Sequence, residues 1–196
     1  MQIEQLISYC RLLTQFQQVE RQMLVPSGER NENDVEHSYL LAMTGWYIAT
    51  TAKLDLQHDK VIKYALVHDL VEVYAGDTYF HDPIRTADKV TREEAAFEAL
   101  RQNYPDFKEL HALIKRYEKQ TDAESRFIYA LDKLLPVVTI YLDGGRSWHR
   151  DKISLELLEF YKSEKVAASA IIADLWSQLA AKLVRQPKLF PPGTKV

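Results

Sequence analysis

Apolar residues recur at helical spacing over almost the whole 196-residue chain. Residues 3–18 show the pattern clearly, because apolar positions three and four apart alternate with Gln, Glu and Arg. No segment shows the alternation of a strand, and each apolar stripe has to be buried against a neighbouring helix. We therefore expect one all-α helical bundle over residues 1–185 and an irregular tail over 186–196. The same spacing predicts further helices over 35–54, 59–74, 91–103, 106–119, 123–142 and 152–184.

Local signals indicate where these helices begin and end. Asp34 is a favourable N-cap residue for the second helix, and Gly76 is a typical residue just after the end of the third. The stretch "TREE" at 91–94 and the pair Thr121 and Glu124 both have capping-box form. The segments 25–33, 77–90 and 143–151 are rich in turn residues, so we expect loops there.

Composition narrows the range of partners. A net charge of −3 and a pI near 6.1 argue against a broad surface for polymeric nucleic acid or for a membrane. A small phosphorylated ligand needs only one or two local cations, so it stays possible. Cys10 is the single cysteine, which excludes an intrachain disulfide and favours a cytoplasmic location. No run of about 18 apolar residues is present.

The dipeptide His-Asp occurs three times between residues 58 and 82. His58-Asp59 stands at the expected start of a helix, where Asp59 has an N-capping role. His81-Asp82 precedes a proline, which favours an extended loop conformation. His68-Asp69 is different, because it lies inside the expected helix 59–74. We therefore expect the first and third pairs to be ordinary surface pairs.

The middle pair stands on the apolar side of its helix. Val61, Ala65, His68 and Glu72 recur at intervals of four, three and four, and Asp69 lies beside that stripe. Burying a carboxylate without a counter-charge costs several kcal/mol, so a positive group should lie close to it. No Lys or Arg occurs between residues 63 and 85. A bound cation would supply the charge; the simpler alternative is a hydrogen bond from His68 to Asp69 or Glu72.

Two further polar residues stand at apolar positions of expected helices. His37 lies in the second helix among apolar residues, although such a histidine alone is more often a satisfied core residue. Asp132 lies among apolar neighbours in the helix 123–142, where Asp is disfavoured both by the helix and by the core. Pro136 removes the helical partner of the Asp132 carbonyl, so we expect a kink that aims the carboxylate. The alternative for Asp132 is a solvated side chain paired with Lys or Arg.

Together, His37, His68, Asp69 and Asp132 offer two imidazole nitrogens and two carboxylates. This set suits one divalent transition metal, Mn, Co, Ni, Fe or Zn, better than Ca or Mg. Four protein ligands on an octahedral ion leave about two positions for water and substrate, which is typical of a catalytic site.

The order His, His-Asp, Asp on successive helices resembles the HD-domain superfamily of metal-dependent phosphohydrolases. The stretches "RNENDVEHS", "LVHDLVEVYAGD" and "DAESRFIYALDK" resemble more closely the subfamily of HD-domain 5′-deoxynucleotidases. The resemblance covers residues 15–140 and implies an HD-domain helical bundle.

Carried over residue by residue, the resemblance implies roles for particular side chains. It implies metal ligands at His37, His68, Asp69 and Asp132. It implies catalytic residues at Glu72 and Asp77, with Asp77 also close to the substrate. The family also uses an Arg, usually followed by a Trp, upstream of the first His. Arg21 is the expected equivalent, and Gln22 or Met23 stands where the Trp would be; Arg30 is a second candidate for the phosphate.

The function that follows is hydrolysis of (deoxy)nucleoside 5′-monophosphates by a 5′-nucleotidase. Lys and Arg are sparse near the motifs, so we expect a pocket with few cations, closed around one phosphate. One alternative is an HD phosphohydrolase that acts on a triphosphate, a cyclic nucleotide or a phosphodiester. Another is a metal- or nucleotide-binding regulatory module without turnover. The expected partners are a small nucleotide substrate and a second copy of the chain in a homodimer.

Overall fold

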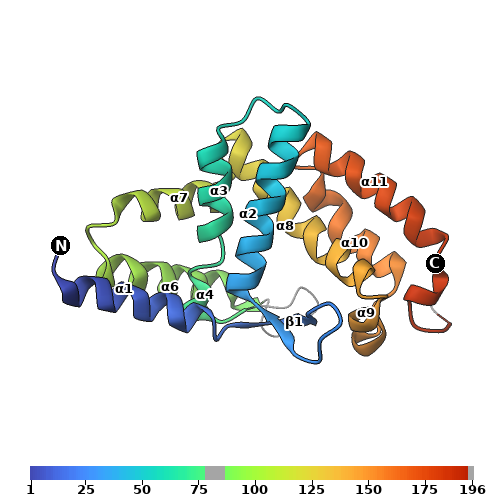
Figure 1. Ribbon diagram of the computed structural model, residues 1–196, viewed down its shortest axis with the longest axis horizontal. Coiled ribbons are helices and arrows are strands. Elements are labelled where there is room, and N and C mark those ends of the chain that lie inside the picture. The colour runs from blue at the N-terminus through green and yellow to red at the C-terminus, as the bar shows by residue number, and fades with distance from the viewer. Residues whose placement is uncertain (78–86, 194–196) are drawn as a thin grey trace.

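The computed structural model describes residues 1–77 and 87–193 and is predominantly helical, which confirms the expected all-α class. Figure 1 shows α2, α3 and α8 in the middle of an elongated molecule, with the two chain termini at opposite ends. The elements are α1 (Ile3–Phe16), β1 (Glu20–Leu24), β2 (Asn31–Asn33), α2 (Asp34–Thr51), α3 (His58–Val67), α4 (Glu72–Ala75), α6 (Lys89–Asn103), α7 (Lys108–Lys119), α8 (Ala123–Leu142), α9 (Arg146–Asp151), α10 (Leu155–Val166), α11 (Ala170–Val184) and a 3₁₀ turn, η1 (Pro187–Leu189).

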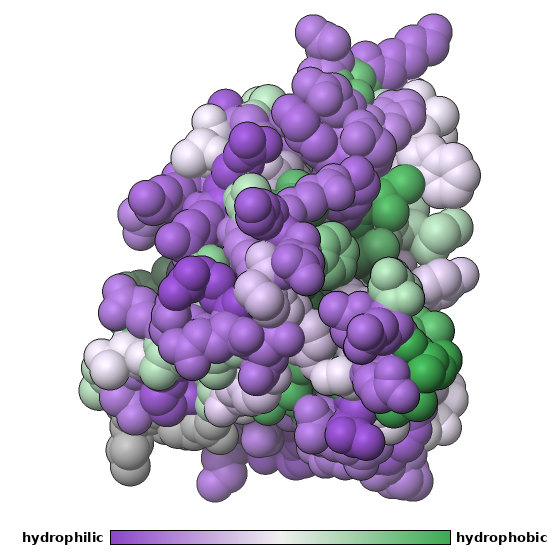
Figure 2. Space-filling model, turned by 90° about the vertical axis from the view of Figure 1, so that its left-hand side faces the viewer, coloured by the Kyte–Doolittle hydropathy of each residue, from purple (hydrophilic) through white to green (hydrophobic). Residues whose placement is uncertain are grey.

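Two hydrophobic clusters hold the helices together. The larger one joins α2, α3 and α8 to α10 and α11, and the smaller one lies among α1, α4, α6 and α7. Gly45 lets α2 approach its neighbours closely, because a Cβ atom there would lie 2.9 Å from Ile128 Cδ1 and 3.2 Å from Val61 Cγ1. The α1–α6–α7 end is mostly covered by hydrophilic residues, with a strip of hydrophobic ones along one edge (Figure 2). Within the two described ranges, no helix is long and apolar enough to cross a bilayer.

The segment expected to be a loop over 25–33 ends in a short strand. β1 and β2 form an antiparallel hairpin in which Glu20 is opposite Asn33 and Leu24 is opposite Asn31. The hairpin also moves the N-cap of α2 to Asn33, whose Oδ1 accepts a hydrogen bond from the Glu36 amide at 3.0 Å. The expectation of Asp34 as N-cap is therefore wrong, and its side chain is available for other contacts.

The third helix is shorter than predicted. α3 ends at Val67, and bonds between residues three apart follow, from the Leu70 amide to the Val67 carbonyl at 3.2 Å and from the Glu72 amide to the Asp69 carbonyl at 2.8 Å. This break leaves no trace in the spacing of apolar residues, since a tighter turn still keeps residues 68 and 72 on the buried side.

Two other helices also begin differently from the prediction. Helix α6 begins before "TREE", with Asp88 as its N-cap residue, and Asp122 together with Ser125 caps α8.

The C-terminal third is also more divided than predicted. Residues 146–151, expected in a loop, form α9, and the single helix expected over 152–184 is the pair α10 and α11. Ser169 has extended backbone angles and ends the continuity between those two helices. Phe190 is buried and stacks on Trp148 with ring centroids 4.8 Å apart. The domain boundary at residue 185 stays a prediction.

Candidate metal centre and its cleft

The four expected metal ligands lie together although they come from three separate parts of the chain. His37 stands in the first turns of α2, His68 and Asp69 follow α3 directly, and Asp132 lies in the middle of α8. One ligand atom from each lies within 4.8 Å of the others. His37 Nε2 is 2.9 Å from Asp132 Oδ1, and His68 Nε2 is 2.9 Å from Asp69 Oδ2.

The orientation of His68 suits a cation. Its Nδ1 lies 2.9 Å from the Ala65 carbonyl, which can only accept, so Nδ1 carries a proton and Nε2 faces Asp69 and Asp132. Burial lowers the pKa of His68, but the two carboxylates outweigh burial and raise that pKa to about 10. The negative charge around Nε2 therefore has to be balanced by a proton or by a metal ion. Two imidazoles and two carboxylates fit a divalent metal well.

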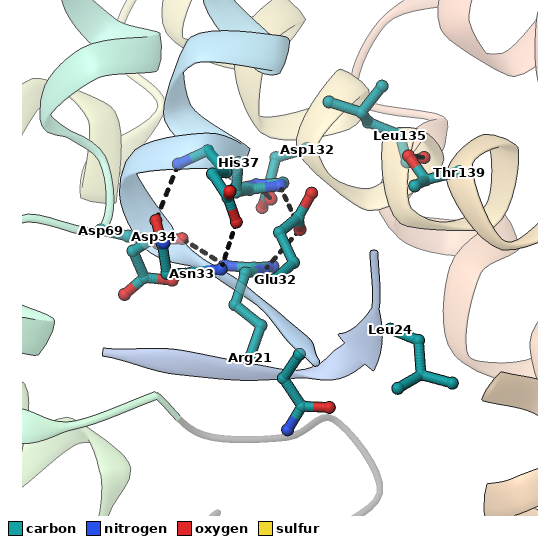
Figure 3. A network of polar contacts seen from close by, with 12 residues as sticks. Arg21, Leu24, Glu32, Asn33, Asp34, His37, Asp69, Asp132, Leu135 and Thr139 are labelled. Carbon is teal, nitrogen blue, oxygen red and sulfur yellow. Dashed lines mark hydrogen bonds and ion pairs between the residues drawn. The ribbon is translucent and has the colours of Figure 1, made fainter. Parts of the chain in front are cut away.

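Arg21 supplies the positive group that the buried carboxylates require. Strand β1 carries it to the centre, where its Nη1 lies 2.9 Å from Asp69 Oδ2 and 3.2 Å from Asp34 Oδ1 (Figure 3). Asp34, Asp69 and Glu72 form a second group of carboxylates whose oxygens lie within 4.8 Å of one another. Because the Arg21 guanidinium bonds two of these three, it neutralises much of this group.

Two buried acids behind the ligands were missed at the sequence level. Glu32 Oε2 lies 3.6 Å from His37 Nδ1 and 3.5 Å from Arg21 Nε, and it contacts both from strand β2 (Figure 3). Asp34 is fully buried beside Arg21. Both residues stand in a polar stretch that resembles a loop. Their burial depends on the hairpin, which the sequence pattern does not reveal.

Glu72 and Asp77 both line the cleft next to the centre. Glu72 is the first residue of α4 and is buried, and burial together with Asp69, Asp77 and Asp34 raises its pKa well above the usual value. Among the described residues, no hydrogen-bond donor reaches its Oε2. Gly76 has a φ of 71°, which glycine adopts without strain, and this turn directs the chain so that Asp77 reaches the cleft.

The structure keeps other candidates away from the centre. Arg30 forms an ion pair with Glu36 on the surface and does not line the cleft in the described part of the chain. His58 and Asp59 are exposed at the start of α3, where Gln57, not Asp59, is the N-cap residue. His81 and Asp82 lie outside the described residues.

The centre opens into a cavity of about 210 Å³ that both charged and apolar side chains line. Gln22 and Met23 line it beside Arg21. The expectation of few cations is wrong, because four lysines line the same cavity. The sequence could have pointed to Lys162, since a lysine at a buried position between apolar residues of α10 is unusual. The lysines are Lys89, Lys133, Lys162 and Lys165, and the apolar part consists of Pro136, Val137, Ile140, Trp148 and Leu158.

Comparison with known proteins gives consistent results. A family model described as HD domain matches residues 13–176. The human and mouse proteins named 5′-deoxynucleotidase HDDC2 are each 34% identical over 131 and 132 residues, which is 65% of this chain. The chain spans 63% and 64% of the length of these two relatives.

Solved structures share the architecture. The crystal structure of a predicted metal-dependent phosphohydrolase from Magnetospirillum magnetotacticum is 30% identical, with a TM-score of 0.81 over 95% of this chain and 96% of that one. A conserved hypothetical protein from Pyrococcus furiosus, 21% identical, has the same fold with a TM-score of 0.62 over 91% of this chain and 99% of its own.

Proposed function

The chain belongs to the HD domain family, and from this premise we propose that it is a metal-dependent phosphohydrolase, a 5′-nucleotidase that removes phosphate from (deoxy)nucleoside 5′-monophosphates. One observation carries the proposal: the four candidate ligand side chains meet beside a cleft that Asp69, Asp132, Arg21 and Glu72 line. The names of the human and mouse relatives and of the Magnetospirillum structure agree with this reaction.

We propose that His37, His68, Asp69 and Asp132 hold one divalent transition metal, Mn, Co, Ni, Fe or Zn. The two carboxylates neutralise a dication. Burial opposes ionisation of Asp132, but Lys133 and His37 outweigh burial and lower the pKa of Asp132, so that this carboxylate stays charged. A divalent metal supplies Lewis-acid polarisation of the phosphoryl group when it is bound.

The remaining groups then have distinct tasks. The guanidinium of Arg21 holds a phosphate oxygen through Nη2, since its Nε and Nη1 face Glu32, Asp34 and Asp69. Its place in the cleft favours it over Arg30. Glu72, a stronger proton acceptor than an ordinary carboxylate because its pKa is raised, takes the proton of the attacking water. The water oxygen forms the new P–O bond as the bond to the 5′ oxygen breaks. That leaving oxygen takes up a proton, for which Asp77 is the proposed donor; a hydrogen bond to a sugar hydroxyl is its alternative role.

The nucleoside has a suitable place in the same cleft. Apolar side chains of α8, α9 and α10 line the same cavity as the charged centre. A base and a sugar bury apolar surface there while the phosphate reaches Arg21 and the metal. We therefore propose that the nucleoside lies against Pro136, Val137, Ile140, Trp148 and Leu158.

The experiment combines metal analysis with phosphate release from a panel of nucleoside and deoxynucleoside 5′-monophosphates. We expect wild-type protein to release phosphate and the Glu72→Gln variant to lose about 10²- to 10⁴-fold in kcat, the usual contribution of a general base, while its metal content is unchanged. Glu156→Gln, at an exposed position of α10, is the matched control and should behave as wild type.

Two outcomes would contradict the proposal. Wild-type protein that binds metal and nucleotide but releases no phosphate is a regulatory module. Full turnover by the Glu72→Gln variant would be compatible with the proposed reaction but would show that Glu72 is not its general base.

A homodimer, a cytoplasmic location and the lack of polymeric nucleic-acid partners stay predictions. One feature supports the homodimer, because the outer face of α2 exposes several large apolar side chains at helical spacing, and such faces often mark association sites. These side chains are Tyr39, Leu40, Met43, Trp46 and Tyr47.

A further inference from the structure

Helix α9 forms one wall of the cleft but is too short to hold its own position. Ser147, Trp148 and Asp151 of this helix line the same cavity as Arg21. The helix has only six residues, and a helix this short is not stable by itself, so its place depends on its neighbours. On one side β1 holds it, because the Leu24 amide donates a hydrogen bond to Ser147 Oγ at 3.0 Å.

The C-terminal tail, residues 186–193, holds α9 on another side. The tail continues from the end of α11 and lies next to α9 (Figure 1). The His149 ring donates a hydrogen bond from Nε2 to the Lys188 carbonyl at 3.0 Å, and Gln186 Nε2 donates one to the Tyr141 hydroxyl at 3.2 Å. The tail is therefore fixed both to α9 and to the last turn of α8.

Phe190 of the tail supports the side chain of Trp148. The ring centroids of these two residues lie 4.8 Å apart and the ring planes differ by 11°, so the rings are stacked. Phe190 is 2% exposed and, in the described part of the chain, does not line the cavity. Trp148 thus faces the cavity with one part of its side chain and Phe190 with another. Without the Phe190 ring a void would lie beside the indole, and neighbouring groups relax in part into such a void.

The approach of the tail to α9 depends on Gly145, the residue just before the helix. A Cβ atom at Gly145 would lie 2.1 Å from the Leu189 carbonyl oxygen, which is an overlap. Gly144 has a similar backbone, with a φ of 67° against 79°, but a Cβ atom at Gly144 would have no described atom within 4 Å. Of this pair, only Gly145 has to lack a side chain for the tail to contact α9.

We propose that Phe190 is a positioning residue, which fixes Trp148 and thereby sets how tightly the cleft binds the nucleoside of the substrate. This inference rests on the proposed function, because it takes the nucleoside to lie against Trp148. Arg21 and the metal ligands come from β1, α2, α8 and the segment after α3, so the tail does not hold them. Loss of the tail contact should therefore weaken binding of the nucleoside and spare binding of the phosphate.

Phosphonates measure this separation on the metal-loaded protein. One probe is methylphosphonate. The others are analogues of deoxyadenosine and thymidine 5′-monophosphate in which CH₂ replaces the 5′ oxygen, so that the P–C bond resists hydrolysis. All carry the same phosphonate group, and the ratio of dissociation constants reports the nucleoside alone. Calorimetry should show that wild-type protein binds at least one nucleoside analogue about tenfold or more tighter than methylphosphonate.

Two variants with matched controls test the tail. Phe190→Ala should lower the preference for the nucleoside analogue about fivefold or more and keep the methylphosphonate constant within about twofold. Gly145→Ala should act in the same direction, because its Cβ displaces Leu189. Gly144→Ala, which has the same left-handed strain without the overlap, and Phe160→Ala, at an exposed position of α10, should keep the preference.

Turnover supplies a second measurement. In phosphate release, Phe190→Ala should raise KM for a monophosphate about fivefold and change kcat less than about twofold, because nucleoside binding is lost equally in the ground state and the transition state. Thermal melts identify a variant that fails to fold, and the other of the two then decides.

The outcomes separate this inference from the proposed function. A preference that survives in both Phe190→Ala and Gly145→Ala overturns the role of the tail. An equal loss for all probes also overturns it, since the tail then supports the whole fold, as does no preference in wild-type protein. None of these results affects hydrolysis of monophosphates at the metal centre. If phosphate release fails while both variants lower the preference, the role of the tail stands and the proposed reaction falls.

Discussion

The acidic centre and the four lysines Lys89, Lys133, Lys162 and Lys165 face one cleft but are built in opposite ways. The centre consists of short side chains held by several neighbours, as in His68, which is fixed by the Ala65 carbonyl on one side and by Asp69 on the other. The lysines stand on long, flexible side chains that come from α6, α8 and α10. The centre is therefore arranged for a cation at one position, whereas the lysines are spread around the same cavity.

This difference predicts different responses to mutation. A metal centre needs all of its ligands within a narrow geometry, so losing one should abolish function. A lysine of the cleft is a single point charge on a flexible side chain, so losing one should weaken phosphate binding only in part. Large effects should thus be confined to the centre and to the groups that orient it.

The largest effect should come from His68→Ala, with His58→Ala as its matched control. Both histidines precede an aspartate, but His68 faces the centre and His58 is exposed at the start of α3. We expect His68→Ala to lose its metal and at least about 10³-fold in phosphate release, because one ligand and the polarising ion are lost together. His58→Ala should keep both. Metal content by mass spectrometry and phosphate release measure this contrast, and equal effects of the two changes would refute the ligand assignment.

A smaller effect is expected for Arg21→Lys. Lysine keeps the charge but cannot contact Asp34, Asp69 and Glu32 from one planar group, as Arg21 does. Losing charge-assisted hydrogen bonds worth about 1.5–3 kcal/mol should lower kcat/KM for a monophosphate by about 10- to 100-fold. Arg30→Lys, which alters an exposed pair with Glu36, should change kcat/KM less than about twofold. A larger loss in Arg30→Lys than in Arg21→Lys would assign the phosphate to Arg30.

The acidic centre and the lysines also differ in how well the sequence alone reveals them. The centre is visible in the sequence, because His68, Asp69 and Asp132 are polar residues at apolar helical positions and each demands an explanation. The lysines of the cleft are nearly invisible in the sequence, since Lys89 and Lys133 are ordinary residues of amphipathic helices until the fold brings them together. Lys162 was also missed, although it stands at a buried position of α10.

The local backbone geometry on either side of the centre could not be predicted from the sequence either. The tight turns between Val67 and Glu72 leave the apolar period intact, so the break after α3 has no signature in the pattern. The hairpin of β1 and β2 is equally hidden, because its strands are short and polar. Yet this hairpin brings Arg21 and Glu32 to the centre, which is why the acids behind the ligands were missed.

The smallest effect should come from one of these hidden acids, through Glu32→Gln. Glu32 Oε2 lies 3.6 Å from His37 Nδ1, where a carboxylate orients the ring and makes its other nitrogen a stronger ligand. A neutral amide weakens this influence, and at this distance we expect metal affinity to fall about tenfold, the lower end for such partners. Glu36→Gln is the neighbouring control, since Glu36 caps α2 and pairs with Arg30 without contacting a ligand. Competition with a metal chelator measures both variants. An unchanged affinity in Glu32→Gln would mean that Glu32 serves Arg21 alone, and the centre would then orient His37 only through Asp132.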